Sequence, residues 1–194
     1  MTEEEIARRR PRSDGQRNRE RLIEAASAAF KAGEIDVPLD EVARRAGVGI
    51  GTLYRHFPTR DALIETVYRN EVAALGQAAK QLAATHAPLD ALRGWMRLFV
   101  DYIAAKQLIA PALNSLVGGT SELYAETGVS MKTAINELVG RAVESGEMRA
   151  DLDPFDLLRA LVGVANVASD AAWEASAKRL IDILIAGSRP DAGK

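Results

Sequence analysis

The chain has 194 residues, of which 47% are hydrophobic and 27% are charged, a composition typical of a folded helical protein and not of a disordered or membrane-embedded one. It has no cysteine and only two histidines, which excludes disulfides, thiol catalysis and cysteine–zinc sites, and we expect neither a metal nor a cofactor. No run of about 18 apolar residues is present and the first residues lack a signal-peptide core, so we expect a cytoplasmic protein without membrane contact.

The formal net charge of −2 argues against a nucleic-acid partner, but the charge is unevenly distributed. Residues 1–60 contain 12 Lys+Arg and 10 Asp+Glu, whereas residues 61–194 contain 13 and 17. Residues 1–16 are rich in arginine and are interrupted by a proline, so we predict a basic flexible arm there. Positive charge is therefore concentrated where a small DNA-binding head would need it.

Helix-forming residues dominate the chain and no segment alternates with a period of two, so we predict an all-α protein of about nine helices. Gly33, Gly47 and Gly146 are expected to end helices, and Thr59 and Asp153 to cap the starts of two others. The predicted helices cover approximately residues 17–32, 39–46, 50–56, 60–84, 92–103, 108–116, 121–145, 155–168 and 173–186.

Two of the short predicted helices, 39–46 and 50–56, are separated by a tight turn that contains glycine. This arrangement is the plan of a helix-turn-helix. Gly47 can adopt the left-handed conformation that the turn requires, and Val48 and Leu53 can fill the joint from below. The side chains on the other face of the second helix are then left to point outward.

The segment from about Arg17 to Tyr68 resembles the amino-terminal domain of the tetracycline-repressor (TetR) family. The residues that carry the resemblance are Ala25-Ala26 with Phe30, Val42-Ala43, Ala46-Gly47-Val48, Gly51-Thr52-Leu53-Tyr54, His56-Phe57, and Arg60 with Leu63. It implies a three-helix head in residues 17–58 that binds an operator in double-stranded DNA. It also implies a helical domain in residues 59–189 that binds an unknown, largely apolar small-molecule effector and forms a homodimer.

The resemblance implies that residues 50–56 form the recognition helix in the major groove and that Arg60 contacts a phosphate. Arg55 is the residue we expect to bond a guanine, because its planar fork matches the two major-groove acceptors. Gly49, Ile50 and Pro38 depart from the family pattern and remove polar phosphate contacts. The predicted DNA-binding residues are Arg19, Arg44, Arg45, Gly49, Ile50, Thr52, Tyr54, Arg55, His56 and Arg60.

Aromatic and polar side chains in the predicted body are candidates for the effector pocket. Aromatic and apolar side chains that recur at helical spacing usually belong to the hydrophobic core, but the resemblance implies that this domain binds a ligand. The candidates are Trp95, Met96, Phe99, Tyr102, Asn114 and Asn136. The asparagines are open to a second interpretation, as surface or capping residues.

The last two predicted helices are apolar on nearly every face. A single chain cannot easily bury that much apolar surface. The resemblance implies that they form a four-helix bundle with a second copy, which presents two recognition helices to a pseudo-palindromic operator. The predicted interface residues are Phe155, Leu158, Val162, Trp173, Leu180 and Leu184.

Two other classes of function compete with a ligand-responsive transcriptional repressor. An enzyme would need a nucleophile–base–acid set, a P-loop or a dinucleotide fingerprint, and none is present, so we expect no enzymatic activity. A helical adaptor that binds protein is the other alternative. Salt-sensitive, sequence-dependent binding to duplex DNA discriminates the regulator from both.

Overall fold

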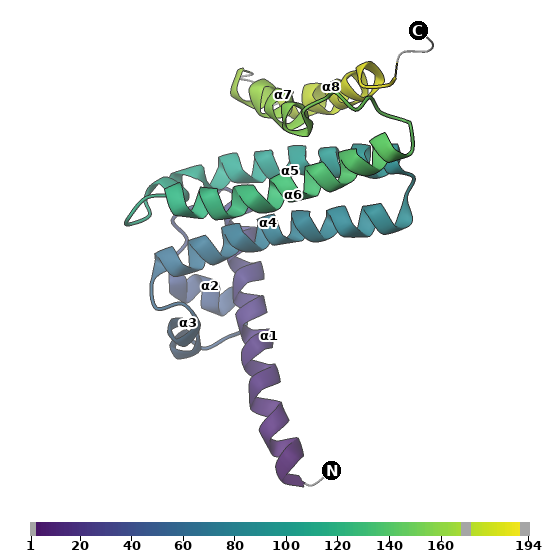
Figure 1. Cartoon of the computed structure of the whole chain (residues 1–194). Coiled ribbons are helices and arrows are strands. Elements are labelled where there is room, and N and C mark those ends of the chain that lie inside the picture. The colour runs from purple at the N-terminus through teal and green to yellow at the C-terminus, as the bar shows by residue number, and fades with distance from the viewer. Residues whose placement is uncertain (1–2, 168–171, 191–194) are drawn as a thin grey trace. The chain divides into compact units, whose positions relative to one another are not determined.

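The computed structural model describes the backbone of residues 3–167 and 172–190, with side chains from residue 14 onward. This part of the chain forms eight α-helices and no strands (Figure 1). The helices are α1 (Glu3–Lys31), α2 (Leu39–Arg45), α3 (Ile50–His56), α4 (Arg60–Thr85), α5 (Pro88–Asn114), α6 (Ser121–Glu144), α7 (Pro154–Val167) and α8 (Trp173–Gly187). The predicted all-α fold is confirmed.

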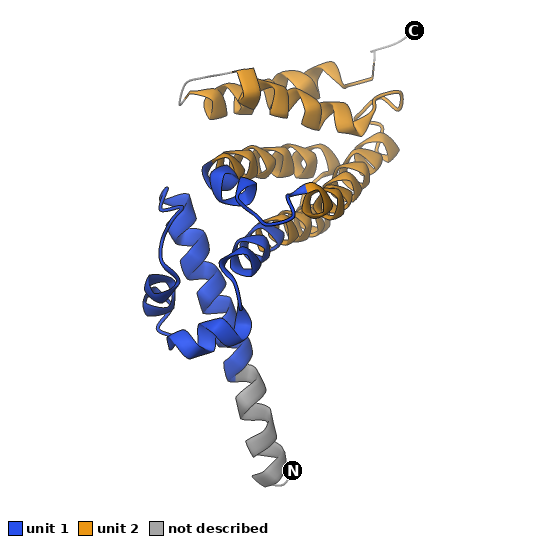
Figure 2. Ribbon diagram, turned by 90° about the vertical axis from the view of Figure 1, so that its left-hand side faces the viewer, with its two compact units in different colours: residues 1–69, 108–120 blue, residues 70–107, 121–194 orange. Residues whose placement is uncertain are grey.

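The chain divides into two compact units, coloured separately in Figure 2. Unit 1 comprises residues 1–69 and 108–120, and unit 2 comprises residues 70–107 and 121–194. Within the described residues no helix is both long and apolar enough to cross a membrane. The same residues contain no group of three or more acidic or histidine side chains that could hold a metal ion.

Unit 1 is built on a three-helix head in which α1, α2 and α3 pack against one another. Its centre contains side chains with almost no exposed surface, at Leu22 and Phe30 of α1, Val42 of α2 and Leu53 of α3. These are the apolar positions at helical spacing in the sequence, so burial of the amphipathic faces holds the head together.

Capping interactions mark the ends of helices in this unit. Gly33 has a φ of 81°, and the N–H of the following residue, Glu34, donates to the carbonyl of Ala29 at 3.0 Å. This pattern is a Schellman motif, which needs a residue in the left-handed region after the helix. At the start of α4 the hydroxyl of Thr59 accepts from the N–H of Ala62 at 3.1 Å, as predicted.

Two predicted boundaries are wrong. The first helix begins at Glu3 and not near Arg17, because the helix propensity of Glu, Arg and Ala in this segment outweighs a single proline. The two helices predicted over 92–103 and 108–116 form one helix, α5, because residues 104–107 are all helix formers and Pro111 is accommodated inside it. Eight helices therefore replace the nine expected.

Unit 2 has a single core to which α5, α6, α7 and α8 contribute, with part of α4. The Trp95 indole is completely buried, and its Nε1 donates to the carbonyl of Leu75 at 2.9 Å, which joins α5 to α4. Ion pairs join α5 to α8, with Arg93 and Asp182 at 3.1 Å and Lys178 and Asp101 at 2.7 Å. Asp153 caps α7 by accepting from the N–H of Phe155 at 2.9 Å, as predicted.

Candidate nucleic-acid interface

The turn between α2 and α3 is closed by a second Schellman motif. Gly47 has a φ of 62°, its N–H donates to the carbonyl of Arg44 at 3.1 Å, and the Val48 N–H donates to the carbonyl of Ala43 at 2.9 Å. A residue with a Cβ is strained in this conformation. The predicted left-handed glycine is confirmed, and it sets the direction in which α3 leaves the turn.

We expect Gly47→Ala to lower the free energy of unfolding by about 1–2 kcal/mol, because the added Cβ lies at ordinary contact distance from the Arg21 guanidinium, 3.6 Å, but the backbone stays left-handed. The matched control is Gly51→Ala in α3, where no atom lies within 4 Å of the added Cβ and alanine favours the helix. Chemical denaturation followed by circular dichroism measures both. Equal effects of the two substitutions would contradict the proposed strain.

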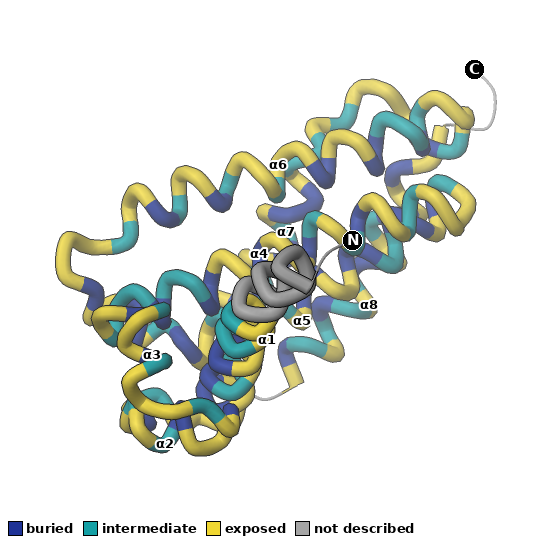
Figure 3. The backbone as a smooth tube through the Cα atoms, turned by 90° about the horizontal axis from the view of Figure 1, so that it is seen from below, coloured by how far each residue is buried: buried dark blue, intermediate teal, exposed yellow. Residues whose placement is uncertain are grey.

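Helix α3 has one buried residue, and its other residues are exposed or half-buried (Figure 3). Leu53 has no exposed surface, whereas Tyr54 and Ile50 are 51% and 43% exposed. Arg55 is exposed as well, Thr52 and His56 are half-buried, and Gly49 is the residue that precedes the helix. A short helix held from one side and exposed on the other is suited to insertion in the major groove.

Among the described side chains Arg55 makes no ion pair, and its Nε donates to the carbonyl of Gly51 at 3.3 Å, within α3. Arg19 behaves differently, because its guanidinium lies 5.4 Å from the centre of the Phe57 ring, at the carboxyl end of α3. Such a cation–π contact connects α1 to the end of α3. Arg55 is therefore free to bind a base, whereas Arg19 is partly engaged.

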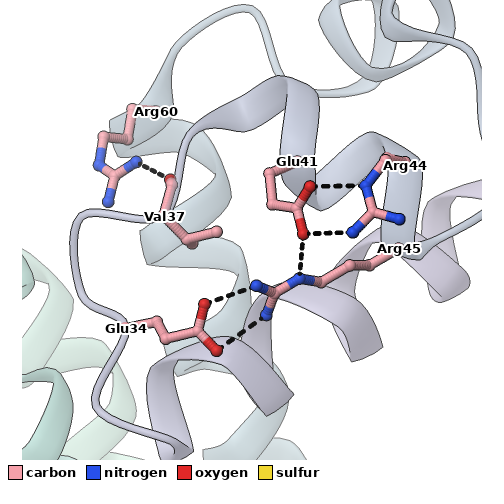
Figure 4. Close-up of polar contacts among 6 residues, drawn as sticks. All are labelled: Glu34, Val37, Glu41, Arg44, Arg45 and Arg60. Atoms are coloured by element: carbon pink, nitrogen blue, oxygen red, sulfur yellow. Dashed lines mark hydrogen bonds and ion pairs between the residues drawn. The ribbon is translucent and has the colours of Figure 1, made fainter.

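Two arginines and two glutamates form a continuous ion-pair network beside the turn, which we call the quartet (Figure 4). Both Glu41 oxygens bind Arg44, at 2.7 Å each, and one also binds the Arg45 Nε at 2.8 Å. The other two Arg45 nitrogens bind Glu34 at 3.0 and 2.6 Å. Hydrogen bonds from Arg44 and then Arg45 lower the pKa of the Glu41 carboxyl to about 2, and those from Arg45 lower the pKa of Glu34.

Arg60 has a different role from the predicted phosphate contact in this structure. Its guanidinium donates to the backbone carbonyl of Val37 at 2.6 Å (Figure 4). It also donates to the carbonyl of Ile35, and both carbonyls lie in the connection between α1 and α2. These carbonyls lie in a loop, where the helices supply no partner for them. Arg60 therefore fastens the start of α4 to the loop that precedes α2.

Sequence reasoning missed the acidic partners of the basic residues. Glu34 lies 11 residues from Arg45 in the chain, and no local spacing rule connects them. Arg21, outside the predicted set, has its guanidinium 3.6 Å from the Cβ position of Gly47 and so borders the turn. The other bonds of the quartet could have been predicted, because Glu41 precedes Arg44 and Arg45 by three and four residues, the spacing at which side chains meet on a helix.

The residues predicted for the effector pocket are placed in different surroundings. Trp95, Met96 and Phe99 are buried in the core of unit 2, and Trp95, Phe99 and Tyr102 stack in sequence with ring centres 5.7 and 5.9 Å apart. Asn114 and Asn136 are exposed. The structure therefore brings the aromatic residues together and does not bring the two asparagines into their cluster.

The residues predicted for the dimer interface also divide into two groups. Leu158 and Trp173 are 2% and 8% exposed, so the chain's own core already covers their side chains. Val162 is 38% exposed, and Phe155, Leu180 and Leu184 are half-buried. Ile183, which was not predicted, is 66% exposed. Periodicity alone could not tell which face of each helix the core covers.

The head therefore has the architecture of a helix-turn-helix DNA-binding protein, with α3 as the exposed helix after the turn. Two family models match the chain: "Bacterial regulatory proteins, tetR family" over residues 22–67, and "Transcriptional regulator SbtR-like, C-terminal domain" over residues 87–190. The chain belongs to the TetR family of transcriptional regulators. It is a DNA-binding regulator and not an enzyme.

Solved structures agree with this assignment over about nine tenths of the chain. The TetR transcriptional regulator SCO0520 from Streptomyces coelicolor is 41% identical with a TM-score of 0.79, and 90% of this chain and 99% of that chain are covered. A TetR transcription regulatory protein from Mycobacterium vanbaalenii is 34% identical with a TM-score of 0.74, and 92% of this chain and 99% of that chain are covered. Among curated proteins, the HTH-type transcriptional regulator BetI of Serratia proteamaculans is 34% identical over 79 residues, which are 39% of this chain and 40% of that one.

Proposed function

We propose that the protein is a repressor that binds a pseudo-palindromic operator as a homodimer and is released by a small-molecule effector. The observation that carries the proposal is α3, which buries Leu53 and exposes Tyr54 and Arg55. We assign DNA binding to residues 17–58, effector binding and dimerisation to residues 59–189, and added contact with the DNA backbone to residues 1–16. The protein would act in the cytoplasm, where a bacterial regulator meets its DNA.

Selection of bound duplexes from a random pool tests the DNA-binding part. We expect two-fold symmetric sites with half-site centres about 34–36 Å apart, because a dimer presents two α3 helices to successive major grooves. Arg55→Ala should then weaken binding by about five- to a hundredfold and relax the preference for one base, as expected for loss of a bidentate guanine contact.

The matched control is Arg97→Ala in α5, which removes the same charge from an exposed position in unit 2. It should leave the operator affinity within about twofold, because Arg97 lies outside the head and the ion pair to Asp182 that the substitution removes is exposed and weak. Enrichment of no sequence would contradict the proposed function, and enrichment of unrepeated half-sites would contradict binding as a dimer.

The proposed dimer surface is the exposed face of α7 and α8. Val162 and Ile183 are exposed there, and Phe155, Leu180 and Leu184 are partly covered. Exposed apolar side chains of this size are stabilised when a second apolar surface covers them. A second copy is the occupant that we propose, since two-fold symmetry pairs a surface with itself.

The proposed effector site lies in unit 2. A groove of about 340 Å³ runs between α4 and α6, and its lining includes Val72, Gly76 and Lys80 from α4 and Val129 and Thr133 from α6. The stacked Trp95, Phe99 and Tyr102 remain the aromatic candidates for a ligand that rearranges the core. An effector on α4 would act on the same helix that begins at Arg60 in the head.

Release by an effector requires that the ligand favour the conformation that binds DNA poorly. A thermal-shift screen of small molecules identifies binders, and titration of the operator complex with each binder measures release. A ligand that raises the melting temperature should also weaken operator binding. Binders that leave the operator affinity unchanged would contradict the proposed coupling.

A further inference from the structure

The quartet of Glu34, Glu41, Arg44 and Arg45 carries no net charge, so the positive surface expected from its arginines is cancelled in the protein without DNA. The two arginines are not equivalent. The Arg45 side chain is 34% exposed and binds carboxylates from two segments, the loop after α1 and helix α2. The Arg44 side chain is 74% exposed and binds only Glu41 among the described residues.

We propose that Arg44 exchanges the Glu41 carboxylate for a DNA phosphate on binding, and that Glu41 thereby lowers the affinity of the free protein for DNA. The proposal rests on the proposed function, because it assumes that this face of the head meets the duplex. Arg45, by contrast, stays with Glu34 and Glu41 and holds the loop to α2.

The geometry favours this division of roles. Arg44 binds Glu41 through Nε and Nη2, and a phosphate offers two oxygens with the spacing that the same fork recognises. An ion pair at this exposure is weak, so a phosphate in the strong field of the duplex can replace the carboxylate. Glu41 does not become an isolated charge after the exchange, because Arg45 Nε still donates to its Oε1 at 2.8 Å.

The experiment measures binding of a labelled operator duplex, or of a random duplex at low salt, by fluorescence anisotropy over a series of salt concentrations. The proteins are wild type, Glu41→Gln, Arg44→Gln and the double variant, all as full chains. We expect Glu41→Gln to tighten binding by about two- to fivefold, the size of an exposed ion pair, and to have no effect when Arg44 is already glutamine.

Two further measurements sharpen the result. Arg44→Gln should reduce the salt slope by about one, as loss of a phosphate contact requires, and it leaves the bonds of Arg45 to both glutamates in place. The matched control is Glu34→Gln, which removes the same charge from the quartet but from the partner of Arg45. Its effect on affinity should be the same with and without Arg44.

A gain in affinity from Glu41→Gln that persists in the Arg44→Gln background would show a general charge effect and overturn the exchange. Weaker binding by Glu41→Gln would show that Glu41 orients Arg44 for DNA, which also overturns it. If the wild type binds DNA and Glu41→Gln binds it with the same affinity, only the proposed exchange is overturned. No binding of the wild type to any duplex overturns the proposed function as well.

Discussion

Replacement of Arg60 with alanine is expected to lower the free energy of unfolding by about 2–4 kcal/mol, a large share of the stability of a domain this size. The substitution removes two hydrogen bonds from a charged donor and leaves the carbonyls of Ile35 and Val37 without that partner. Chemical denaturation of the purified protein measures the change. Arg60→Lys should recover part of it, since an ammonium group can bond one of the carbonyls.

Arg55→Ala is the matched control for Arg60→Ala, because Arg55 is an exposed arginine whose hydrogen bond, to Gly51, stays within α3. Its free energy of unfolding should stay within about 0.5 kcal/mol of the wild type. The two arginines should therefore separate, one affecting stability and the other DNA binding. Wild-type stability of Arg60→Ala together with a loss of DNA affinity would instead support the phosphate contact that the family resemblance implies.

A double substitution, Val162→Asp with Ile183→Asp, is expected to convert the proposed dimer to a monomer at micromolar concentration. Both side chains are exposed in the single chain, at 38% and 66%, so aspartate disturbs the fold of one protomer little but places like charges in the proposed interface. Light scattering coupled to size exclusion measures the mass. Operator affinity should fall about a hundredfold or more, because each head then binds alone.

Val129→Asp in α6 is the control for the proposed dimer surface, since Val129 is 66% exposed, as Ile183 is, but lies outside α7 and α8. It should leave the mass of the dimer unchanged. Persistence of the dimer in the double variant, or dissociation in the control, would contradict the assignment of the interface to α7 and α8.

The sequence was sufficient to predict the helix-turn-helix almost residue by residue because local signals define it. Gly33 and Gly47 adopt the left-handed conformation, Pro58 follows the end of α3, and Thr59 caps α4, each within a few residues of the backbone it controls. Such features depend on steric and hydrogen-bonding rules that act over one turn. A helix was predicted over residues 50–56, and α3 covers Ile50–His56.

The partners of the charged side chains could not be predicted in the same way. The bond from Arg60 to Val37 joins residues 23 apart in the chain, and no local spacing rule predicts it. Which apolar residues of α7 and α8 face the core also depends on tertiary packing, so the sequence did not show that Leu158 and Trp173 are buried within the chain itself. Local sequence patterns predict where helices lie, whereas tertiary packing decides which face of each helix is buried.

The neutral quartet also bears on how fast the regulator finds its site. A bacterial chromosome offers millions of incorrect positions, and the time spent on each increases with the charge that the protein presents to the DNA backbone. With Arg44 held by Glu41 at 2.7 Å, the head presents one cation fewer to an arbitrary duplex. The expected consequence is shorter residence on random DNA, so that a molecule visits more positions per unit time before it stops at its operator.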